Sequence, residues 1–290
     1  MCALRSEADC LVAMNPPAEN TQNSSTDSRL PVSVFTITLN EEANIGRLLA
    51  SVKDFAGELL IVDSGSSDNT LKIAESFGAR IISNAWPGYS QQKQFAMEHC
   101  VHDWCLCLDA DEEVTPELAA RLPELLQDTE IAAYRFGRKD CFVGSAPPNG
   151  VHLRGHTRLL RKSRCRFDLA RTVHEGVIVD GRIGRIDVAF LHYGYDDFAG
   201  HNDKNNKYSG LKAAEKAQEQ PTPSYLRLIF AGPVKFLQSY VVHRNFLWGW
   251  RGFVQSMAIG YYGFSIEARR FEIAARLKTD NDSKTTAQKQ

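Results

Sequence analysis

Between residues 31 and 110, short apolar segments alternate with segments whose apolar residues recur at helical spacing, and this alternation constrains the fold most. The expected strands are 32–38, 58–62, 80–83 and 104–108. The helices expected between them are 45–52, 70–77 and 91–99. Strand–helix alternation of this kind predicts an α/β fold, with a mostly parallel, Rossmann-like sheet that helices cover on both faces. Such sheets bind ligands beyond the carboxyl ends of their strands.

The second half of the chain alternates less regularly. Short strands are expected at 132–136, 157–160, 176–179 and 188–192, and a lysine-rich helix at 202–219. We therefore divide the chain into a disordered, polar N-terminal extension, an α/β domain, a C-terminal helical and aromatic-rich region, and a polar tail. These parts are residues 1–30, 31–200, 201–278 and 279–290.

The richest polar motif follows the fourth expected strand. Four carboxylates, Asp109, Asp111, Glu112 and Glu113, occur within five residues. Close like charges are unfavourable unless a cation balances them, and carboxylates without nearby His or Cys suit Mg²⁺ or Mn²⁺. In an extended strand end, Asp109, Asp111 and Glu113 would share a face. The alternative is a solvated acidic turn before a helix that begins at Pro116.

A second polar site follows the second expected strand. Asp63 closes that strand, where its carboxylate could accept a hydrogen bond from a nucleotide base or ribose. The alternative is an Asx-turn before the helix at 70–77. A dinucleotide-binding dehydrogenase would need a G-x-G-x-x-G motif after the first strand, and the segment from Thr38 to Gly46 contains one glycine.

Composition limits the partners and the compartment. The formal net charge is −1, so we expect no nucleic-acid partner. Seven cysteines without a C-x-x-C pair favour free thiols in a reducing compartment over a zinc site. No secretory signal is visible, and no apolar run approaches the roughly 18 residues of a spanning helix. We therefore expect a cytoplasmic protein.

The motifs in their order resemble one family. The relevant segments read FTITLNEEANIGRLLASV, LLIVDSGSSDNTLKIAESFGARI, WPGYSQQKQFAMEHCVHDWCLCLDADEEVTPEL and TVHEGVIVDGRIG. Together they resemble the family 2 glycosyltransferases of the GT-A fold, over about residues 31–270. Within the family, the chain is similar to lipopolysaccharide core glycosyltransferases that add a hexose, often glucose, to inner-core heptose.

The resemblance implies roles for several residues. Thr38 and Glu41 would line the nucleotide pocket, and Asp63 would contact the base. Lys93 would face the donor phosphates, although a lysine on a helix is commonly solvated surface. Asp109 and Asp111 would be the D-x-D pair of a divalent metal, Mn²⁺ or Mg²⁺, with Asp111 the closer ligand and a UDP-sugar as the donor.

Members of this family generally invert the anomeric configuration, which needs one base opposite the leaving diphosphate. The candidate base is Glu175, whose alternative role is that of a surface residue at a strand start. Asp168 and Asp187 are further candidates for the base. His192 could reach the metal or the diphosphate, or be a structural histidine.

The segment 225–271 combines aromatic and basic residues, which is typical of a membrane interface. Peripheral contact with the inner face of the cytoplasmic membrane would suit a lipid-linked saccharide acceptor. Packing on the α/β domain, or a dimer contact, is the alternative; RNA binding is disfavoured because no RNA-binding motif is present. Two other functions share the fold: a sugar nucleotidyltransferase, which would need a glycine-rich loop after the first strand, and a non-catalytic nucleotide-sugar or membrane-binding module, against which the carboxylates argue.

Overall fold

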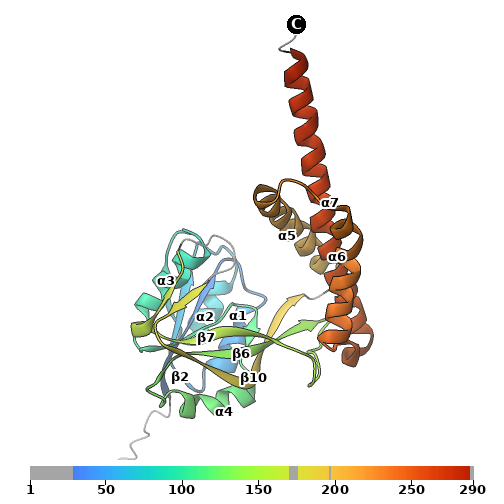
Figure 1. Ribbon diagram of the computed structural model, residues 1–290. Helices are drawn as coiled ribbons and strands as arrows, with labels where there is room; N and C mark the ends of the chain where they lie inside the picture. The colour runs from blue at the N-terminus through green and yellow to red at the C-terminus, as the bar shows by residue number, and fades with distance from the viewer. Residues whose placement is uncertain (1–28, 170–175, 196, 288–290) are drawn as a thin grey trace, which may run out of the picture.

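The computed structural model describes residues 29–169, 176–195 and 197–287. The N-terminal part of this chain forms an α/β domain, and a group of helices stands beside it (Figure 1). The longest of these helices projects away from the α/β domain. The predicted combination of a helix-flanked sheet and a C-terminal helical extension is therefore confirmed.

The main sheet has eight strands in the order β3-β2-β1-β4-β7-β6-β10-β5. Only β7 and β5 run antiparallel to their neighbours, so six strands share one direction. The strands are β1 (Leu30–Thr38), β2 (Ala56–Asp63), β3 (Arg80–Ser83), β4 (Trp104–Cys107), β5 (Glu112–Glu113), β6 (Ile131–Phe142), β7 (Arg154–Arg161) and β10 (Arg182–Tyr195). A separate two-stranded sheet pairs β8 (Cys165–Phe167) with β9 (Val177–Val179). The mostly parallel sheet agrees with the prediction.

Helices cover both faces of the sheet. They are α1 (Ile45–Val52), α2 (Thr70–Ser76), α3 (Tyr89–His99) and α4 (Pro116–Leu125). On one face, Leu48 of α1 and Leu118 of α4 pack in a cluster with Val34 of β1. On the other face, Met97 of α3 packs with Phe35 of β1. Because consecutive strand residues point to opposite faces, Val34 and Phe35 supply one core each.

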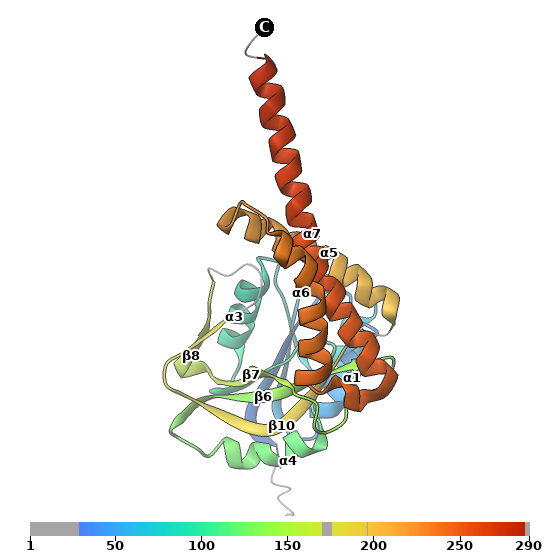
Figure 2. The same cartoon turned by 45° about the vertical axis from the view of Figure 1, so that its right-hand side comes forward.

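The C-terminal region consists of helices that pack mainly on one another (Figure 2). They are α5 (Phe198–Glu219), α6 (Tyr225–Leu237), the π-helical turn η2 (Gln238–Val242), the 3₁₀ turn η3 (Asn245–Trp248) and α7 (Gly249–Ala287). The stretch predicted as a polar tail from Thr279 is thus continuous with α7 as far as Ala287. In the described part of the chain, no helix has the length and apolarity needed to span a bilayer.

The loop between β6 and β7 joins the α/β domain to the helical region. The backbone N–H of His152 donates to the carbonyl of His243 at 2.9 Å. The indole N–H of Trp248 donates to Oγ of Ser145 at 3.4 Å. These contacts place the turn after η2, together with η3, against the loop between β6 and β7.

Candidate active site

The loops that follow β1 and β2 are tied together at the carboxyl edge of the sheet. Asn40 adopts a φ of 57°, a left-handed conformation that asparagine tolerates. Its backbone N–H donates to Oγ of Ser66 at 2.8 Å, and its side-chain oxygen accepts from the N–H of Ser67 at 2.9 Å. The N–H of Glu41 donates to Oγ1 of Thr70 at 2.8 Å. The two loops therefore form one ordered wall beside the strand ends.

Asp63 is buried in this wall, and its own turn engages the carboxylate fully. Oδ1 accepts from the hydroxyls of Thr38 at 2.9 Å and Ser66 at 2.5 Å. Oδ2 accepts from the N–H groups of Gly65 and Ser66, each at 2.8 Å. Burial raises the pKa of Asp63, but these hydrogen bonds outweigh it and hold the pKa below its usual range.

The four acceptor positions of a carboxylate are thus all used inside the protein at Asp63. This geometry is the Asx-turn that was the alternative to base binding. Thr38, its neighbour in the β1–β2 register, is buried with it. The nucleotide-binding roles of Thr38 and Asp63 stay predictions, and the structure places both residues at the expected edge.

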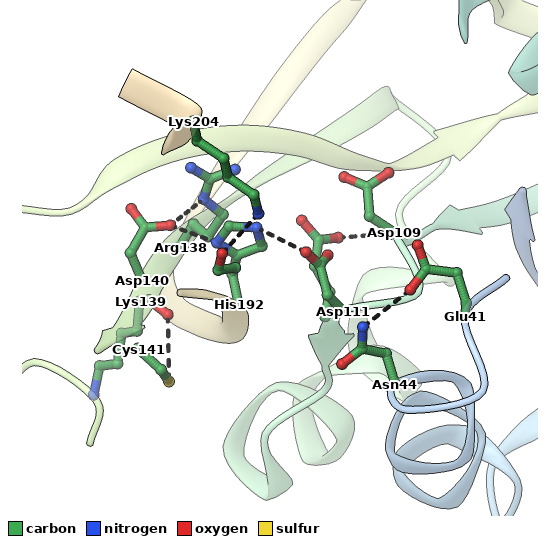
Figure 3. Close-up of polar contacts among 12 residues, drawn as sticks. Glu41, Asn44, Asp109, Asp111, Arg138, Lys139, Asp140, Cys141, His192 and Lys204 are labelled. Carbon is green, nitrogen blue, oxygen red and sulfur yellow. Dashed lines mark hydrogen bonds and ion pairs between the residues drawn. The ribbon is translucent and has the colours of Figure 1, made fainter. Parts of the chain in front are cut away.

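Glu41 lies on the same edge, with its carboxylate close to that of Asp111 (Figure 3). The side-chain amide of Asn44 donates to Oε2 of Glu41 at 3.0 Å. Burial raises the pKa of Glu41, and the Asn44 hydrogen bond opposes this; Asp111 adds to the rise, leaving the pKa above the ordinary value. Its predicted role in the nucleotide pocket stays untested.

A four-residue charge network lies behind the strand ends. The ammonium of Lys93, on α3, lies 2.7 Å from Oδ1 of Asp109. The guanidinium of Arg158, on β7, lies 2.7 Å from Oδ2 of Asp109 and also contacts Glu112. Glu112 in turn accepts from the backbone N–H of Asp109 at 3.0 Å. Lys93 is therefore a buried partner of Asp109 and not solvated surface.

Charges within this network shift each other's protonation. Burial opposes ionisation of Asp109, but Arg158 and Lys93 outweigh it and hold the pKa of Asp109 far below its usual range. Burial raises the pKa of Glu112 to about 7; Arg158 opposes the rise and the neighbouring charge of Asp109 adds to it. The network thus carries two cations, one firmly ionised carboxylate and one carboxyl group that resists ionisation.

Asp111 belongs to a second network, with His192 and Asp140, and its side chain is 26% exposed (Figure 3). Oδ2 of Asp111 lies 3.3 Å from Nε2 of His192 on β10. Nδ1 of His192 lies 2.8 Å from Oδ1 of Asp140. Burial lowers the pKa of His192, but hydrogen bonds with Asp111 and Asp140 outweigh it and raise the pKa to about 9. His192 therefore links Asp111 to Asp140 and orients the Asp111 side chain.

The prediction that Glu113 joins Asp109 and Asp111 was wrong. The chain turns after Asp109, because the N–H of Glu112 donates to the Asp109 carbonyl at 2.9 Å. Side chains therefore no longer alternate between the two faces of the sheet there. The carboxylate of Glu112 instead accepts a hydrogen bond from the backbone N–H of Asp109. Glu113 instead accepts from the hydroxyl of Tyr193.

Two cations of the site were missed by the sequence argument. Arg158 falls within the expected strand at 157–160, where one charged residue precedes a pair of leucines; this interruption was the available signal. Lys204, on α5, donates to the carbonyl of Gly194 at 2.7 Å and acts electrostatically on Asp111 and Glu41. It was hidden among other lysines and asparagines of a polar helix.

Two of the three candidate bases, Asp168 and Asp187, fall within the described residues. Glu175 lies outside the described residues. The backbone N–H of Asp168 donates to the carbonyl of Gly176 at 2.7 Å. Asp187, on β10, lines a groove away from the carboxylates at the strand ends. Across residues 29–169, 176–195 and 197–287, no three His, Cys, Asp or Glu side chains are grouped to hold a metal ion.

The described cysteines agree with free thiols. Cys100, Cys105, Cys107, Cys141 and Cys165 are all buried and unbridged. Cys105 and Cys107 lie in the core cluster on the α3 face of the sheet. They are core residues, as expected for the strand at 104–108.

Comparison with known proteins identifies the class of enzyme. Residues 33–180 match the family described as Glycosyl transferase family 2. The lipopolysaccharide core biosynthesis glycosyltransferase LpsC of Rhizobium meliloti (strain 1021) is 37% identical over 266 residues, which cover 87% of this chain and 97% of LpsC. The chain belongs to glycosyltransferase family 2. The predicted family, GT-A fold and enzyme class are therefore confirmed.

A further relative and two solved structures are similar to this chain. The uncharacterized glycosyltransferase RP128 of Rickettsia prowazekii (strain Madrid E) is 32% identical over 263 residues, covering 86% of this chain and 89% of RP128. Residues 1–349 of S. aureus TarS, in complex with UDP, match with a TM-score of 0.45 and 14% identity, over 86% of this chain and 91% of that one. Glucosyl-3-phosphoglycerate synthase from Mycobacterium tuberculosis, in complex with Mn²⁺, UDP and glucosyl-3-phosphoglycerate, matches with a TM-score of 0.38 and 18% identity, over 56% and 71% of the two chains.

Proposed function

We propose that this chain transfers a hexose, glucose, from a UDP-sugar to the lipopolysaccharide inner core, with inversion at the anomeric carbon. One observation supports it above all: Thr38, Asp63, Asp109 and Asp111 come from three separate loops to one edge of the sheet, where α/β enzymes bind ligands. The 37% identity to LpsC, a lipopolysaccharide core biosynthesis glycosyltransferase, supports the acceptor class.

Asp111 is the ligand that we propose for a divalent metal, Mn²⁺ or Mg²⁺. Both oxygens of Asp109 already contact cations, at 2.7 Å from Lys93 and from Arg158. Asp111 contacts only the imidazole of His192 among the ion pairs of the described residues, and its side chain is 26% exposed. Oxygen ligands of this kind suit Mg²⁺ and Mn²⁺, and such an ion supplies Lewis-acid stabilisation to a leaving diphosphate.

Cationic side chains of this chain would help to balance the negative charge of the donor diphosphate. Lys93 and Arg158 hold Asp109 in place, and Lys204 lies near enough to act on Asp111 and Glu41. A diphosphate bound beside Asp111 would face a site whose negative charge is already balanced. Glu175 remains the proposed base, taking the proton of the acceptor hydroxyl as that oxygen attacks the anomeric carbon.

We further propose that the helical region contacts the inner face of the cytoplasmic membrane, where a lipid-linked acceptor would be found. Large apolar side chains are exposed along α6 and α7 at spacings of three and four residues, which puts each set along one side of its helix. They include Leu226, Phe230, Val234, Trp250, Phe253, Met257, Tyr261 and Phe264. Arg227, Lys235 and Arg251 lie among them, as expected for a surface that meets anionic lipid.

The transfer proposal is tested with nucleotide sugars and Mn²⁺. We expect one UDP-sugar to raise the melting temperature only when Mn²⁺ is present, because metal and diphosphate bind together. At the Mn²⁺ concentration that gives half-maximal hydrolysis in the wild type, hydrolysis of that donor should be lost in Asp111→Asn and retained in Asp54→Asn, a matched control at an exposed position. The anomeric configuration of the transferred hexose, measured by NMR, should be inverted. A donor that binds equally well without metal and is hydrolysed by Asp111→Asn would refute the proposal.

The membrane proposal is tested separately by flotation with vesicles of phosphatidylglycerol and phosphatidylcholine. Phe230→Ser combined with Trp250→Ser should reduce the bound fraction, since both side chains are about half exposed on the helical region. Val101→Ser combined with Ile178→Ser removes two exposed apolar side chains from the α/β domain and should leave the bound fraction unchanged. Equal losses in both variants would contradict a defined membrane-facing surface.

A further inference from the structure

A basic groove lies where the α/β domain meets the helical region. Its volume is about 1540 Å³, and it opens to solvent. Strands β6, β7 and β10 form its floor, and Val242 and Arg244, at the turn after η2, close one side. The hydrogen bond from His152 to His243 holds that turn against the loop between β6 and β7. Residues of both the α/β domain and the helical region therefore form the groove.

The charge of this groove is strongly positive. Five cationic side chains line it: Arg135, Lys139, Arg154, Arg185 and Arg244. Two acids, Glu117 and Asp187, also line it. No ion pair joins any of the five cations to another residue that the structure describes. The only side-chain hydrogen bond among them runs from Lys139 to the amide oxygen of Asn149, at 3.2 Å.

Other arginines on the same strands form ion pairs. Arg138 pairs with Asp140 at 2.9 Å, and Arg161 pairs with Asp103 at 3.4 Å. The groove cations differ from these arginines because they form no ion pair with the described residues, and they outnumber the two acids of the groove. Gathering five like charges around one cavity costs free energy, and a bound anion would offset that cost.

His156 adds a neutral polar group to the groove. Burial, together with Arg138 and Arg158, lowers its pKa to about 4, so the imidazole is uncharged at neutral pH. Its Nε2 is buried and makes no hydrogen bond with the described residues. Such an atom suits a ligand that carries hydroxyl groups as well as negative charge.

We propose that this groove binds the phosphate or carboxylate groups of the acceptor saccharide. The inference rests on the proposed function, because a saccharide acceptor is its premise. The donor diphosphate is not the expected occupant, since Thr38, Asp63, Asp109 and Asp111 do not line the groove. Val242 is 69% exposed, lines the groove and is the last residue of η2, the turn that directly follows α6. A lipid-linked acceptor could thus place its lipid on the exposed apolar side chains of the helical region and its anionic sugars in the groove.

The test uses deacylated lipopolysaccharide core oligosaccharide that retains its phosphates and carboxylates, with binding measured by calorimetry. Arg154→Gln combined with Arg185→Gln should weaken binding about tenfold at low salt, because two charge contacts are lost. The weakening should shrink as ionic strength rises. Lys53→Gln combined with Arg276→Gln removes the same charge from exposed positions outside the groove, and should leave the dissociation constant within about twofold.

Two further measurements separate the possible causes. Donor hydrolysis with Mn²⁺ should be the same in the groove variant as in the wild type, which shows that the variant is folded and that the loss concerns the acceptor. Binding to phosphatidylglycerol vesicles should also be unchanged. If the groove variant lost vesicle binding and kept oligosaccharide binding, the groove would be a lipid-headgroup site and the proposal would be overturned. Unchanged oligosaccharide binding would overturn it as well.

Failure of the proposed function gives a different result. If the wild type hydrolysed no nucleotide sugar, but the oligosaccharide bound and was lost in the groove variant alone, the groove inference would stand without the transferase activity. The two hypotheses are therefore tested independently.

Discussion

Lys93 and Asp109 form a close ion pair, with the ammonium 2.7 Å from Oδ1, that joins α3 to the end of β4. Arg158 neutralises the second oxygen of Asp109 from β7. Because of these contacts, we expect the two aspartates of the D-x-D pair to have different roles. Asp109 fixes the geometry of the strand end, and Asp111 is the aspartate that we propose as the metal ligand.

We expect the two aspartates to differ in metal dependence. Asp111→Asn should raise the Mn²⁺ concentration needed for half-maximal donor hydrolysis by about 100-fold or more, since a catalytic metal supplies several kcal/mol of charge stabilisation. Asp109→Asn should mainly lower stability, because it removes the carboxylate that contacts both Lys93 and Arg158. Manganese titrations of activity and urea unfolding of both variants measure the difference. Equal metal dependence in the two variants would contradict these different roles.

Loss of the Lys93 ammonium should be felt as lost stability. Lys93→Met removes one of two cations from Asp109, whose side chain is 35% exposed and keeps Arg158. Because solvent and Arg158 compensate in part, we expect a decrease of about 1–3 kcal/mol in the free energy of unfolding. Lys53→Met, at an exposed position, should change it by less than about 0.5 kcal/mol. Urea unfolding followed by circular dichroism provides both values, and similar values would argue against a structural role for Lys93.

The sequence predicted the α/β half well because the relevant signals are local. The strands at 32–38, 58–62, 80–83 and 104–108 and the helices between them are set by residue spacing, and the structure has each of them. The position of Asp63 and Asp109 at strand ends follows directly. The partners of those side chains do not, because Arg158 is 49 residues from Asp109 and only the tertiary fold brings them together. The turn that displaced Glu113 has no clear signal in the sequence either.

Glu58 provides a pH-dependent contribution to stability far from the acidic strand end. Oε1 of Glu58 lies 2.5 Å from the guanidinium of Arg80, and Oε2 accepts from the N–H of Val101 at 2.7 Å and from the hydroxyl of Ser33. Burial raises the pKa of Glu58, but these contacts outweigh it and lower the pKa below 4.5. The folded state therefore favours the ionised form more than the unfolded state does.

The resulting stabilisation should be fully present above pH 4.5 and should be lost as the pH falls through the lowered pKa. The difference in unfolding free energy between wild type and Glu58→Gln should thus be largest near pH 7 and shrink below pH 4. Urea unfolding of both proteins across this range tests the prediction, with Glu98→Gln on exposed surface as the control. A difference that grew on acidification would contradict it.

A buried ion network joins α5, the loop after it and α7. Nη1 of Arg270 lies 2.7 Å from Oε2 of Glu267, and Nη2 donates to the carbonyl of Gln220 at 2.7 Å. Lys216 of α5 reaches the other oxygen of Glu267 at 3.2 Å. Arg270 is 2% exposed, so removing it leaves the buried carboxylate of Glu267 with only the more distant and partly exposed Lys216 as an ion-pair partner among the described residues.

Arg270→Met alone should therefore destabilise the helical region by about 3–5 kcal/mol. The double variant Glu267→Leu, Arg270→Met should be less destabilised than Arg270→Met, because no unpaired charge remains. Limited proteolysis, with cleavage sites located by mass spectrometry, should show faster cutting between α5 and α7 in the single variant and slower cutting in the double variant. Donor hydrolysis should persist in both, since these residues lie outside the candidate active site. If the double variant were as unstable as the sum of the two single variants, packing and hydrogen bonds to the Gln220 carbonyl would be the main contribution of Arg270, and the ion pair a minor one.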